Sequence, residues 1–552
     1  MVQGMKKGSM MAGAEQHGRV EDGSHEAGQS ALTPQEVTAC CQQLVARGEG
    51  DQAVSLAIQI AQGTQDVALI LAAGLFLVRF TPRHEVVIAV FRKALLLMPE
   101  AEPAMASMRG EVKIFLAGAL MVAGEREEAM ALFMDVARTL PEHRVLVGEH
   151  LSMALLEAGL ADQAEQVLLA WLADGPPSVS LYNNMGCALG RLNRSRDALA
   201  YYRRGMELSS RHEAVSFGYA IALLKAGEYE EGFARYVRRV PRIPSLNCWF
   251  YQDLPRLTND VPLEGRHLLF YQEQGLGDTI QFIRFLPEIV RRAGRVTLAV
   301  LPSLARLLRE SYPMVQVCLI TELLDHPERV AEYDFSCPIP DLPYLCHLRH
   351  VADIPAFSPY LEVPVRRREH FARLVEQAVA QGGRAGGHSP AGRRLRVGLV
   401  WAGDSRSSAQ DVAADRRRSS SFAEMMEALG PVEADLFSLQ YGDRRGELEP
   451  VEGQGAVVHD LMGHVQDMAD TAALMESLDL VISVDTAPLH LAGALGREVW
   501  LVSRWDACWR WGDEGDRTPW YPTMHIFRAQ ELSLAPVLKD VAVSLRRRIA
   551  EG

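Results

Sequence analysis

Several features that would assign the chain to a special class of protein are missing from its 552 residues. No apolar run reaches the roughly 18 to 20 residues that a membrane-spanning helix needs, and the first residues, MVQGMKKGSMMAGAEQHG, lack the apolar core of a signal peptide. The eight cysteines are scattered, without a CxxC pair, which argues against a disulfide framework or a zinc site. We therefore expect a cytoplasmic protein with reduced thiols and no stable membrane insertion.

Long basic blocks are also missing. Arginine greatly outnumbers lysine among the 57 basic side chains, and 70 acidic side chains bring the formal net charge to −13. A net acidic chain of this kind argues against non-specific binding to nucleic acid. The hydrophobic content of 48% and the mean hydropathy of −0.03 fit a soluble globular protein, and the length predicts two to four domains.

A motif of about twelve residues is present four times in the first half: VAGEREEAMALF, EAGLADQAEQVL, RLNRSRDALAYY and KAGEYEEGFARY. Its turn residue is Gly124, Gly159, Asn193 and Gly227, and five residues later a small residue follows at Ala129, Ala164, Ala198 and Gly232. Glycine and asparagine suit the left-handed conformation that ends a helix, and the small residue lets a second helix approach closely. The motif therefore predicts repeated helix–turn–helix units.

The spacing of 34 or 35 residues is typical of tetratricopeptide repeats. An earlier pair of turns, at Gly48 and Pro82, extends the pattern, so residues 33–240 are predicted to form an α-superhelix. The concave face of such an array usually binds an extended peptide, although the repeats could instead form a homodimer or support the rest of the chain. Residues 1–32 are predicted to be a disordered tail, and residues 241–266 a linker.

The second half alternates short apolar runs with helical patterns, twice over. HLLFY, RVTLAV and MVQVCLI read as strands of a first unit, residues 267–380, and RVGLVWAG, ADLFSLQ, LDLVISVD and EVWLVS as strands of a second, residues 395–552. The Gly-rich residues 381–394 are predicted to link them. Such alternation predicts parallel sheets covered by helices, and a ligand-binding cleft where the carboxyl ends of the strands converge.

One strand-to-helix junction is the stretch YQEQGLGDTIQF. Gly275 and Gly277 would permit tight backbone geometry and the close approach of a substrate, and Asp278 lies near the start of the following helix. Asp278 is therefore either a helix cap or an acid in the cleft.

A second junction is SVDTAPLH, where a strand ends at Asp485 and Pro488 begins a helix. Free N–H groups at this helix start would form an anion site suited to a diphosphate, within reach of His490. Alternatively, Thr486 is a plain cap and His490 a partly buried residue. A third junction carries Arg416, Arg417 and Arg418, which form either a phosphate-binding cluster or a solvated loop.

Taken together, EQGLGDTIQFIRFLP, VGLVWAG, FSLQ, DTAALMESLDLVISVDTAPLHLAGALG and WRW…DRTPWYPTMHIFR resemble bacterial tetratricopeptide-repeat glycosyltransferases. The catalytic half is similar to the lipopolysaccharide heptosyltransferases and, more distantly, to the O-linked N-acetylglucosamine transferases. The resemblance extends from about residue 33 to the end of the chain.

The resemblance implies a GT-B fold, a pair of Rossmann-like domains in which the C-terminal one holds a nucleotide sugar. It assigns the general base to Asp278, the acceptor-side loop to Gly275, Gly277 and Gln281, and donor binding to Asp485, Thr486, Ala487, His490, Arg418 and Gln440. It also implies inverting, metal-independent transfer with no cofactor beyond the nucleotide-sugar co-substrate. The sequence agrees, since it has no convincing DxD-like pair and no His/Cys metal cluster.

One departure from the family is Tyr441, where relatives often carry a basic residue after SLQ, so the phosphate contact would pass to Arg444 or to the Arg416–Arg418 cluster. We expect sugar transfer to a Ser or Thr hydroxyl of a protein acceptor, for example a flagellin-like surface protein, recruited by the repeats. The alternatives are a lipid-linked or polysaccharide acceptor, and a non-catalytic adaptor. The sequence does not specify the sugar or the base of the donor.

Overall fold

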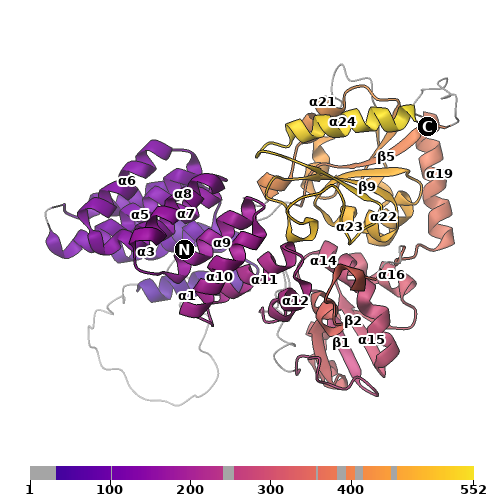
Figure 1. Cartoon of the computed structure of the whole chain (residues 1–552), viewed down its shortest axis with the longest axis horizontal. Coiled ribbons are helices and arrows are strands. Elements are labelled where there is room, and N and C mark those ends of the chain that lie inside the picture. Colours follow the sequence, from indigo (N-terminus) through magenta and orange to yellow (C-terminus); the bar gives the residue numbers. More distant parts are fainter. Residues whose placement is uncertain are drawn as a thin grey trace, which may run out of the picture.

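The computed structural model describes residues 33–100, 102–239, 254–355, 359–381, 393–404, 415–448 and 457–551. The predicted tail 1–32, the first half of the linker 241–266 and most of the linker 381–394 lie outside the described residues. Figure 1 shows a helical array beside an α/β half with two sheets.

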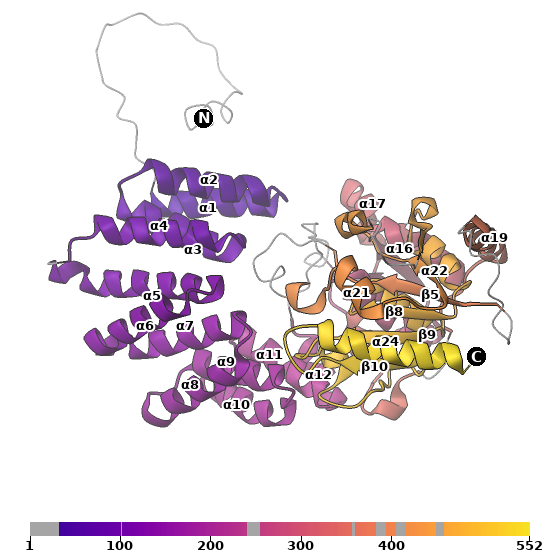
Figure 2. The ribbon, with the colours of Figure 1, turned by 90° about the horizontal axis from the view of Figure 1, so that it is seen from above.

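The array consists of antiparallel helices that stack pair upon pair, as Figure 2 shows from above. In chain order the helices are α1 (Pro34–Ala46), α2 (Gly50–Gly63), α3 (Val67–Phe80), α4 (His84–Leu97), α5 (Ala106–Ala123), α6 (Arg126–Thr139), α7 (Arg144–Glu157), α8 (Ala161–Asp174), α9 (Val179–Arg191), α10 (Ser195–Leu208), α11 (Glu213–Lys225) and α12 (Tyr229–Tyr236). The predicted helix–turn–helix repeats are confirmed.

The turns within the helix pairs have the left-handed backbone conformation that the repeated motif predicts. Gly124, Gly159, Asn193 and Gly227 have φ values of 96°, 79°, 56° and 84°. The small residues five positions later are buried; a Cβ on the last of them, Gly232, would lie 2.7 Å from the Leu224 side chain. The turn at Pro82 differs, because proline holds φ negative and no left-handed residue is present there.

The first α/β unit is built on a parallel sheet in the order β3-β2-β1-β4. Its strands are β1 (His267–Tyr271), β2 (Arg295–Val300), β3 (Gln316–Leu319) and β4 (Phe335–Pro338), and its helices include α14 (Leu276–Phe282), α15 (Leu286–Arg292), α16 (Pro302–Ser311), α17 (Ile320–Asp325) and α18 (Leu342–Leu345). Strand β4 was not predicted. The single helical pattern TIQFIRFLPEIVRRAG is split by a 3₁₀ turn at Ile283–Phe285, just before Pro287.

The second unit is a parallel sheet in the order β10-β9-β8-β5-β6-β7. The strands are β5 (Leu395–Val400), β6 (Ala434–Ser438), β7 (Val458–Asp460), β8 (Leu480–Val484), β9 (Glu498–Ser503) and β10 (Met524–Arg528), with helices α21 (Phe422–Leu429), α22 (Met468–Met475), α23 (Ala487–Ala494) and α24 (Ala535–Ala550). Helix α19 (Val365–Gln381) precedes this unit and packs on α22. Strands β7 and β10 were not predicted.

Both sheets reverse their strand order at an inner position, between β1 and β4 in one and between β5 and β8 in the other. Parallel sheets bind ligands beyond the carboxyl ends of the strands at such a switch point. The loops that follow β1 and β8 lead into α14 and α23, and these two helices are in contact at the junction of the two units (Figure 1). The two switch points therefore face one another.

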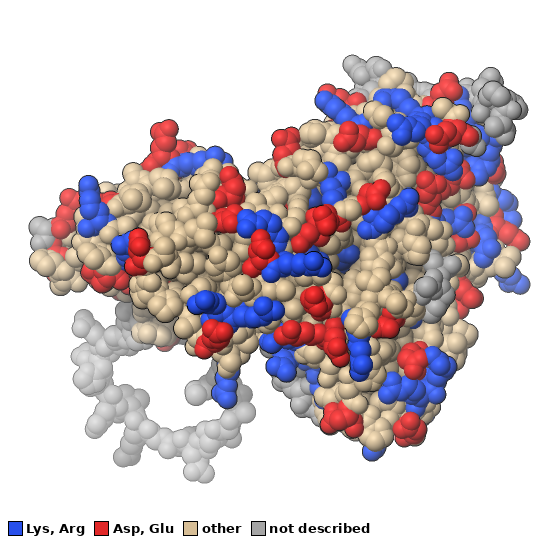
Figure 3. All heavy atoms as spheres, in the orientation of Figure 1, with Lys and Arg blue, Asp and Glu red and all other residues tan. Residues whose placement is uncertain are grey.

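The surface and the thiols fit the composition. On the face that Figure 3 shows, Lys and Arg side chains lie among Asp and Glu side chains. All cysteines within the described ranges are free thiols. No helix in the described part of the chain combines the length and the apolar character that crossing a membrane requires.

Candidate functional site

The loop between β1 and α14 places Asp278 at the junction. Helix α14 begins at Leu276 with Gly275 as its N-cap residue, and the Asp278 carboxylate accepts a hydrogen bond from the Gly275 N–H at 2.9 Å. Asp278 therefore caps the helix from its third position. The left-handed residue of the loop is Gln274, with φ of 63°, whereas φ of Gly275 is −83°. The expectation that the glycines supply the unusual backbone geometry is wrong at this point.

Gly277 has a packing function at the junction of the two units. A Cβ at this position would lie 2.7 Å from Cδ2 and 3.3 Å from Nε2 of His490. Gly277 thus permits the close approach of helix α23 from the other unit, and the approach of a substrate at this residue stays a prediction.

Asp278 is paired across the junction with Arg510, which comes from the 3₁₀ turn Trp509–Trp511 after β9. The Arg510 guanidinium also donates to Oε1 of Gln281, on the turn of α14 that follows Asp278. Burial by itself lowers the pKa of Arg510, but the adjacent Asp278 carboxylate opposes this and the net shift is upward. Arg510 is therefore a buried, permanently charged group that bridges two residues of the first unit.

Helix α23 starts without a side-chain cap. Thr486 is the N-cap residue, but its hydroxyl donates to Val484 O at 3.2 Å and makes no bond to the first turn. Pro488 lies in that first turn, as predicted. Asp485 accepts a hydrogen bond from Nε1 of Trp511 at 2.9 Å. The backbone N–H groups at Thr486 and Ala487 therefore remain suited to an anion.

His490 lies inside the junction. Its Nδ1 is 2.8 Å from the Tyr521 hydroxyl, its Nε2 is 3.8 Å from Asp485, and its ring stacks on Trp511 with centroids 5.5 Å apart. Burial lowers the pKa of His490 to about 4, although Asp485 acts in the opposite direction. His490 is consequently neutral at pH 7 and offers a hydrogen bond rather than a positive charge.

The three consecutive arginines do not form one cluster. Arg418 Nη1 lies 3.4 Å from the carbonyl oxygen of Asp485, whereas Arg417 pairs with Asp506 at 3.2 Å. Arg416 lies near His84 of the repeat array. Burial is the larger cause of the lowered pKa of His84, and the positive charge of Arg416 lowers it further. Of the three, only Arg418 is placed at the start of α23.

The alternative phosphate contact, Arg444, is already bonded to other residues of the second unit. It pairs with Glu447 and donates to Ser420 O at 2.7 Å. Tyr441, which replaces the family's basic residue, has its hydroxyl 2.5 Å from Thr471 Oγ1. Neither side chain contacts the start of α23.

Gln440 is a buried tie between the ends of β5 and β6. Its Oε1 accepts from the N–H groups of Trp401 and Ala402 at 3.1 and 3.0 Å, and its Nε2 donates to Ala402 O and Tyr441 O at 2.9 and 3.0 Å. These bonds engage both ends of the amide, so Gln440 shapes the β5–β6 edge, and its contact with a donor stays a prediction.

Arg510 is the residue that sequence reasoning missed. The stretch WDACWRWGDEGDRTPW stands out for its tryptophans, but nothing in it indicates a partner more than 200 residues earlier. Glu273, the carboxylate nearest to Asp278 in sequence, is buried and paired with Arg239. Within the described ranges, no group of three or more His, Cys, Asp or Glu residues could hold a metal ion.

These residues together provide a carboxylate, a buried guanidinium, a neutral imidazole and an uncapped helix start within one junction. The Nε2 group of Gln281 is buried and has no hydrogen-bond partner among the described residues. Such an arrangement can accept a proton from a hydroxyl group on one side and stabilise an anion on the other.

Comparison with known proteins identifies repeats in the first half of the chain. Residues 81–240 match the family model described as tetratricopeptide repeat. The chain contains tetratricopeptide repeats followed by a parallel-sheet α/β half. It is also similar to Protein FlbA of Caulobacter vibrioides, with 25% identity over 458 residues, which cover 72% of this chain and 72% of that protein.

Among solved structures, a glycosyl transferase of family 9 from Veillonella parvula has a TM-score of 0.36 and 11% identity, covering 53% of this chain and all of that one. The ADP-heptose lipopolysaccharide heptosyltransferase II of E. coli has a TM-score of 0.34 and 14% identity, covering 51% and 99%. An O-GlcNAc transferase mutant from Thermobaculum terrenum has a TM-score of 0.27 and 13% identity, covering 82% and 94%.

Proposed function

We propose that this protein is an inverting glycosyltransferase that moves a sugar from a nucleotide-sugar donor to a hydroxyl group of a protein acceptor. The observation that carries the proposal is the pairing of Asp278 with Arg510 at the point where the switch points of two parallel sheets meet. One sheet contributes a carboxylate to the junction, and the other contributes an uncapped helix start and an arginine. Two-substrate chemistry needs this division, because the acceptor and the donor must approach from opposite sides.

On the acceptor side, Asp278 takes the proton of the attacking hydroxyl group. Its carboxylate is oriented by the Gly275 N–H and by Arg510, so that it is held in one position before the substrate binds. Nε2 of Gln281, which has no hydrogen-bond partner among the described residues, then donates to the acceptor or the sugar.

On the donor side, the leaving phosphate binds at the start of α23, against the N–H groups of Thr486 and Ala487 and the side chain of Arg418. The negative charge that develops there competes with Asp278 for Arg510. This competition frees the carboxylate at the step that needs a base. The neutral His490 contributes a hydrogen bond.

On this proposal the repeat array recruits the acceptor. Its stack of helix pairs ends in α11 and α12 beside the junction (Figure 2), so that a polypeptide held by the repeats lies next to the site. The acceptor group is a Ser or Thr hydroxyl, as in a flagellin-like surface protein. We also propose that transfer is metal-independent and needs no cofactor beyond the nucleotide-sugar co-substrate, as the resemblance to the heptosyltransferases implies.

A panel of nucleotide sugars tests the donor half of the proposal. The full-length protein is screened by thermal shift, and each stabilising donor is then assayed for hydrolysis without acceptor. We expect stabilisation and slow hydrolysis with one nucleotide class. If no nucleotide sugar binds at millimolar concentration, the protein is a non-catalytic adaptor.

The acceptor half is tested by intact-mass analysis. Candidate surface proteins, including a flagellin, are incubated with enzyme and the donor found above, in the presence and absence of EDTA. We expect a mass increase of one or more sugar units with and without the chelator. Transfer to a lipid-linked or polysaccharide acceptor but to no protein would contradict the role given to the repeats, and loss of transfer in EDTA would contradict the metal-independent step.

A further inference from the structure

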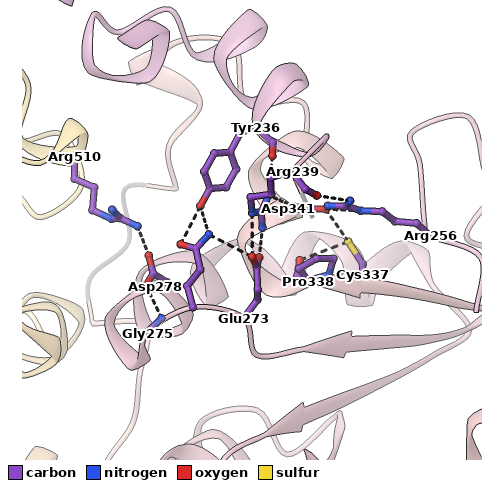
Figure 4. Close-up of polar contacts among 11 residues, drawn as sticks. Tyr236, Arg239, Arg256, Glu273, Gly275, Asp278, Cys337, Pro338, Asp341 and Arg510 are labelled. Carbon is purple, nitrogen blue, oxygen red and sulfur yellow. Dashed lines mark hydrogen bonds and ion pairs between the residues drawn. The ribbon is translucent and has the colours of Figure 1, made fainter. Parts of the chain in front are cut away.

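The last repeat helix contacts the loop that carries Asp278. The Tyr236 hydroxyl at the end of α12 lies 2.8 Å from Nε2 and 3.1 Å from Oε1 of Gln274 (Figure 4). Gln274 directly precedes Gly275, the residue whose N–H group binds the Asp278 carboxylate. A side chain of the repeat array is thus connected to Asp278 through one residue and one helix cap.

Gln274 needs such a contact because of its backbone. Its φ of 63° lies in the left-handed region, where a side chain with a Cβ atom is disfavoured. A strained residue of this kind persists only when the surrounding structure holds it in place. The amide of Gln274 also lies 3.4 Å from Oε1 of Glu273, but the shorter contacts are those to Tyr236.

A buried ion network fixes the position of Tyr236 relative to the loop. Arg239 pairs with Glu273 in the loop and, at 2.8 Å, with Asp341 after β4, which in turn pairs with Arg256 at 2.5 Å. The Arg239 guanidinium also stacks on the Tyr236 ring, 4.0 Å from its centroid. Two positive and two negative side chains balance here, and such buried pairs specify orientation more than they add stability.

Helix α12 also packs against the segment that carries Arg510. Phe233 packs on Phe282 of α14 and on Trp509, the residue before Arg510, with centroids 6.2 and 6.0 Å apart. The rings of Phe282 and Trp509 are themselves stacked. One hydrophobic cluster therefore includes the last repeat and both units of the α/β half.

We propose that Tyr236 is a positioning residue for the reaction, which holds Gln274 in its left-handed conformation and so places the Gly275–Asp278 cap at the junction. The catalytic role of Tyr236 rests on the proposed function, whereas its contact with Gln274 does not. It makes the last repeat a part of the catalytic site rather than only an acceptor-binding module.

Hydrogen exchange tests the positioning without any substrate. In full-length Tyr236→Phe, we expect the amides of residues 272–280 to exchange roughly fivefold faster, because the loop opens more often without the hydrogen bond. The matched control is Tyr202→Phe, which removes a buried hydroxyl from α10 where its contact is the Cys187 thiol at 3.5 Å. Unchanged exchange in the loop of Tyr236→Phe overturns the proposal.

Kinetics and a rescue separate positioning from general destabilisation. Tyr236→Phe is expected to lower kcat about tenfold while KM for the donor stays within about twofold, because the donor binds on the other unit. Adding Gln274→Gly should restore most of the kcat, since glycine adopts φ of 63° without strain. A double variant that is no faster than Tyr236→Phe overturns the role of Gln274, and a wild-type kcat in Tyr236→Phe overturns the role of Tyr236.

The exchange and kinetic experiments distinguish a failure of this proposal from a failure of the proposed function. If the wild-type protein transfers no sugar, the proposed function fails, while the exchange rates of residues 272–280 still decide whether Tyr236 holds the loop. If transfer occurs and loop exchange is unaltered in Tyr236→Phe, the proposed function stands and the positioning role fails.

Discussion

Asp278 combines a structural and a chemical property in one side chain. Its carboxylate accepts the Gly275 N–H bond that starts α14 and also carries the charge that balances Arg510. Capping and base catalysis are therefore compatible interpretations of this residue. The cap orients the carboxylate, and under the proposed function a leaving phosphate that attracts Arg510 would make it available.

Asparagine at position 278 tests the base. Asp278→Asn keeps the size of the side chain and an oxygen for the Gly275 N–H bond, but it cannot accept a proton. We expect turnover at saturating donor to fall about 10²- to 10⁴-fold, with a folded protein by thermal melting. The control is Asp260→Asn, on a fully exposed residue, which should match the wild type. Near-wild-type turnover in Asp278→Asn removes this residue as the base.

The pH dependence of stability tests the environment of His490. Burial lowers its folded-state pKa from 6.5 to about 4, so between these values the unfolded chain binds the proton more readily and stability falls as the pH falls. From pH 7.5 to 4.5, the wild type should lose about 2 to 3 kcal/mol more unfolding free energy than His490→Gln. Urea unfolding followed by tryptophan fluorescence measures this difference.

An exposed histidine supplies the comparison for that experiment. His326, 63% exposed at its side chain, should leave the pH profile of the wild type unchanged when it is replaced by Gln. Parallel profiles for the wild type and His490→Gln would show that the imidazole is solvated in the folded protein.

At the scale of elements, the junction depends on how closely α14 and α23 approach. Their contact is possible because Gly277 has no side chain where the His490 ring lies, and because Pro488 and Thr486 start α23 directly after β8. This helix pair brings the two switch points of the sheets together.

A methyl group at position 277 tests that contact. In Gly277→Ala the new Cβ would lie 2.7 Å from His490, so the helices must move apart. We expect about 1 to 3 kcal/mol of destabilisation and at least a tenfold loss in kcat/KM. In contrast, Gly118→Ala in α5 has open space around the new methyl group and should be stabilised by about 0.5 to 1 kcal/mol. Equal behaviour of the two variants would refute the packing argument.

At the scale of the whole molecule, ion pairs join the two α/β units beside the site. Arg306 on α16 of the first unit contacts Asp467 and Asp470 of α22 in the second, at 2.5 and 2.8 Å. Asp470 is buried and also pairs with Arg367 on α19. These contacts help to hold the two units in the arrangement in which Asp278 reaches Arg510.

Removing one of these charges should loosen the contact between the two units. Arg306→Gln leaves both aspartates without one partner across the junction, so we expect KM for the donor to rise about three- to tenfold and the radius of gyration by small-angle scattering to increase. Arg309→Gln, on the same helix but bonded to Val317 O within its own unit, is the matched control. An unchanged KM in Arg306→Gln would show that these pairs do not control how the two units pack at the donor site.

The local features of the fold could be read from the sequence. The left-handed turns at Gly124, Gly159, Asn193 and Gly227 depend on one residue each, and the strands β1, β5 and β8 on short apolar runs beside helix signals. The two corners of the site, after β1 and β8, follow from the same signals. Short strands such as β7, with three residues, carry too little pattern to be predicted.

Tertiary structure alone decided which side chains meet. The Asp278–Arg510 pair joins residues 232 positions apart, and it forms because two largely buried side chains of opposite charge meet where the two units pack together. The same holds for the separation of Arg416, Arg417 and Arg418, and for the contact of Tyr236 with the left-handed Gln274. Backbone preference is a property of a residue and its neighbours, and the sequence determines it directly. Burial and charge pairing are properties of the assembled molecule, which is why only the folded chain reveals them.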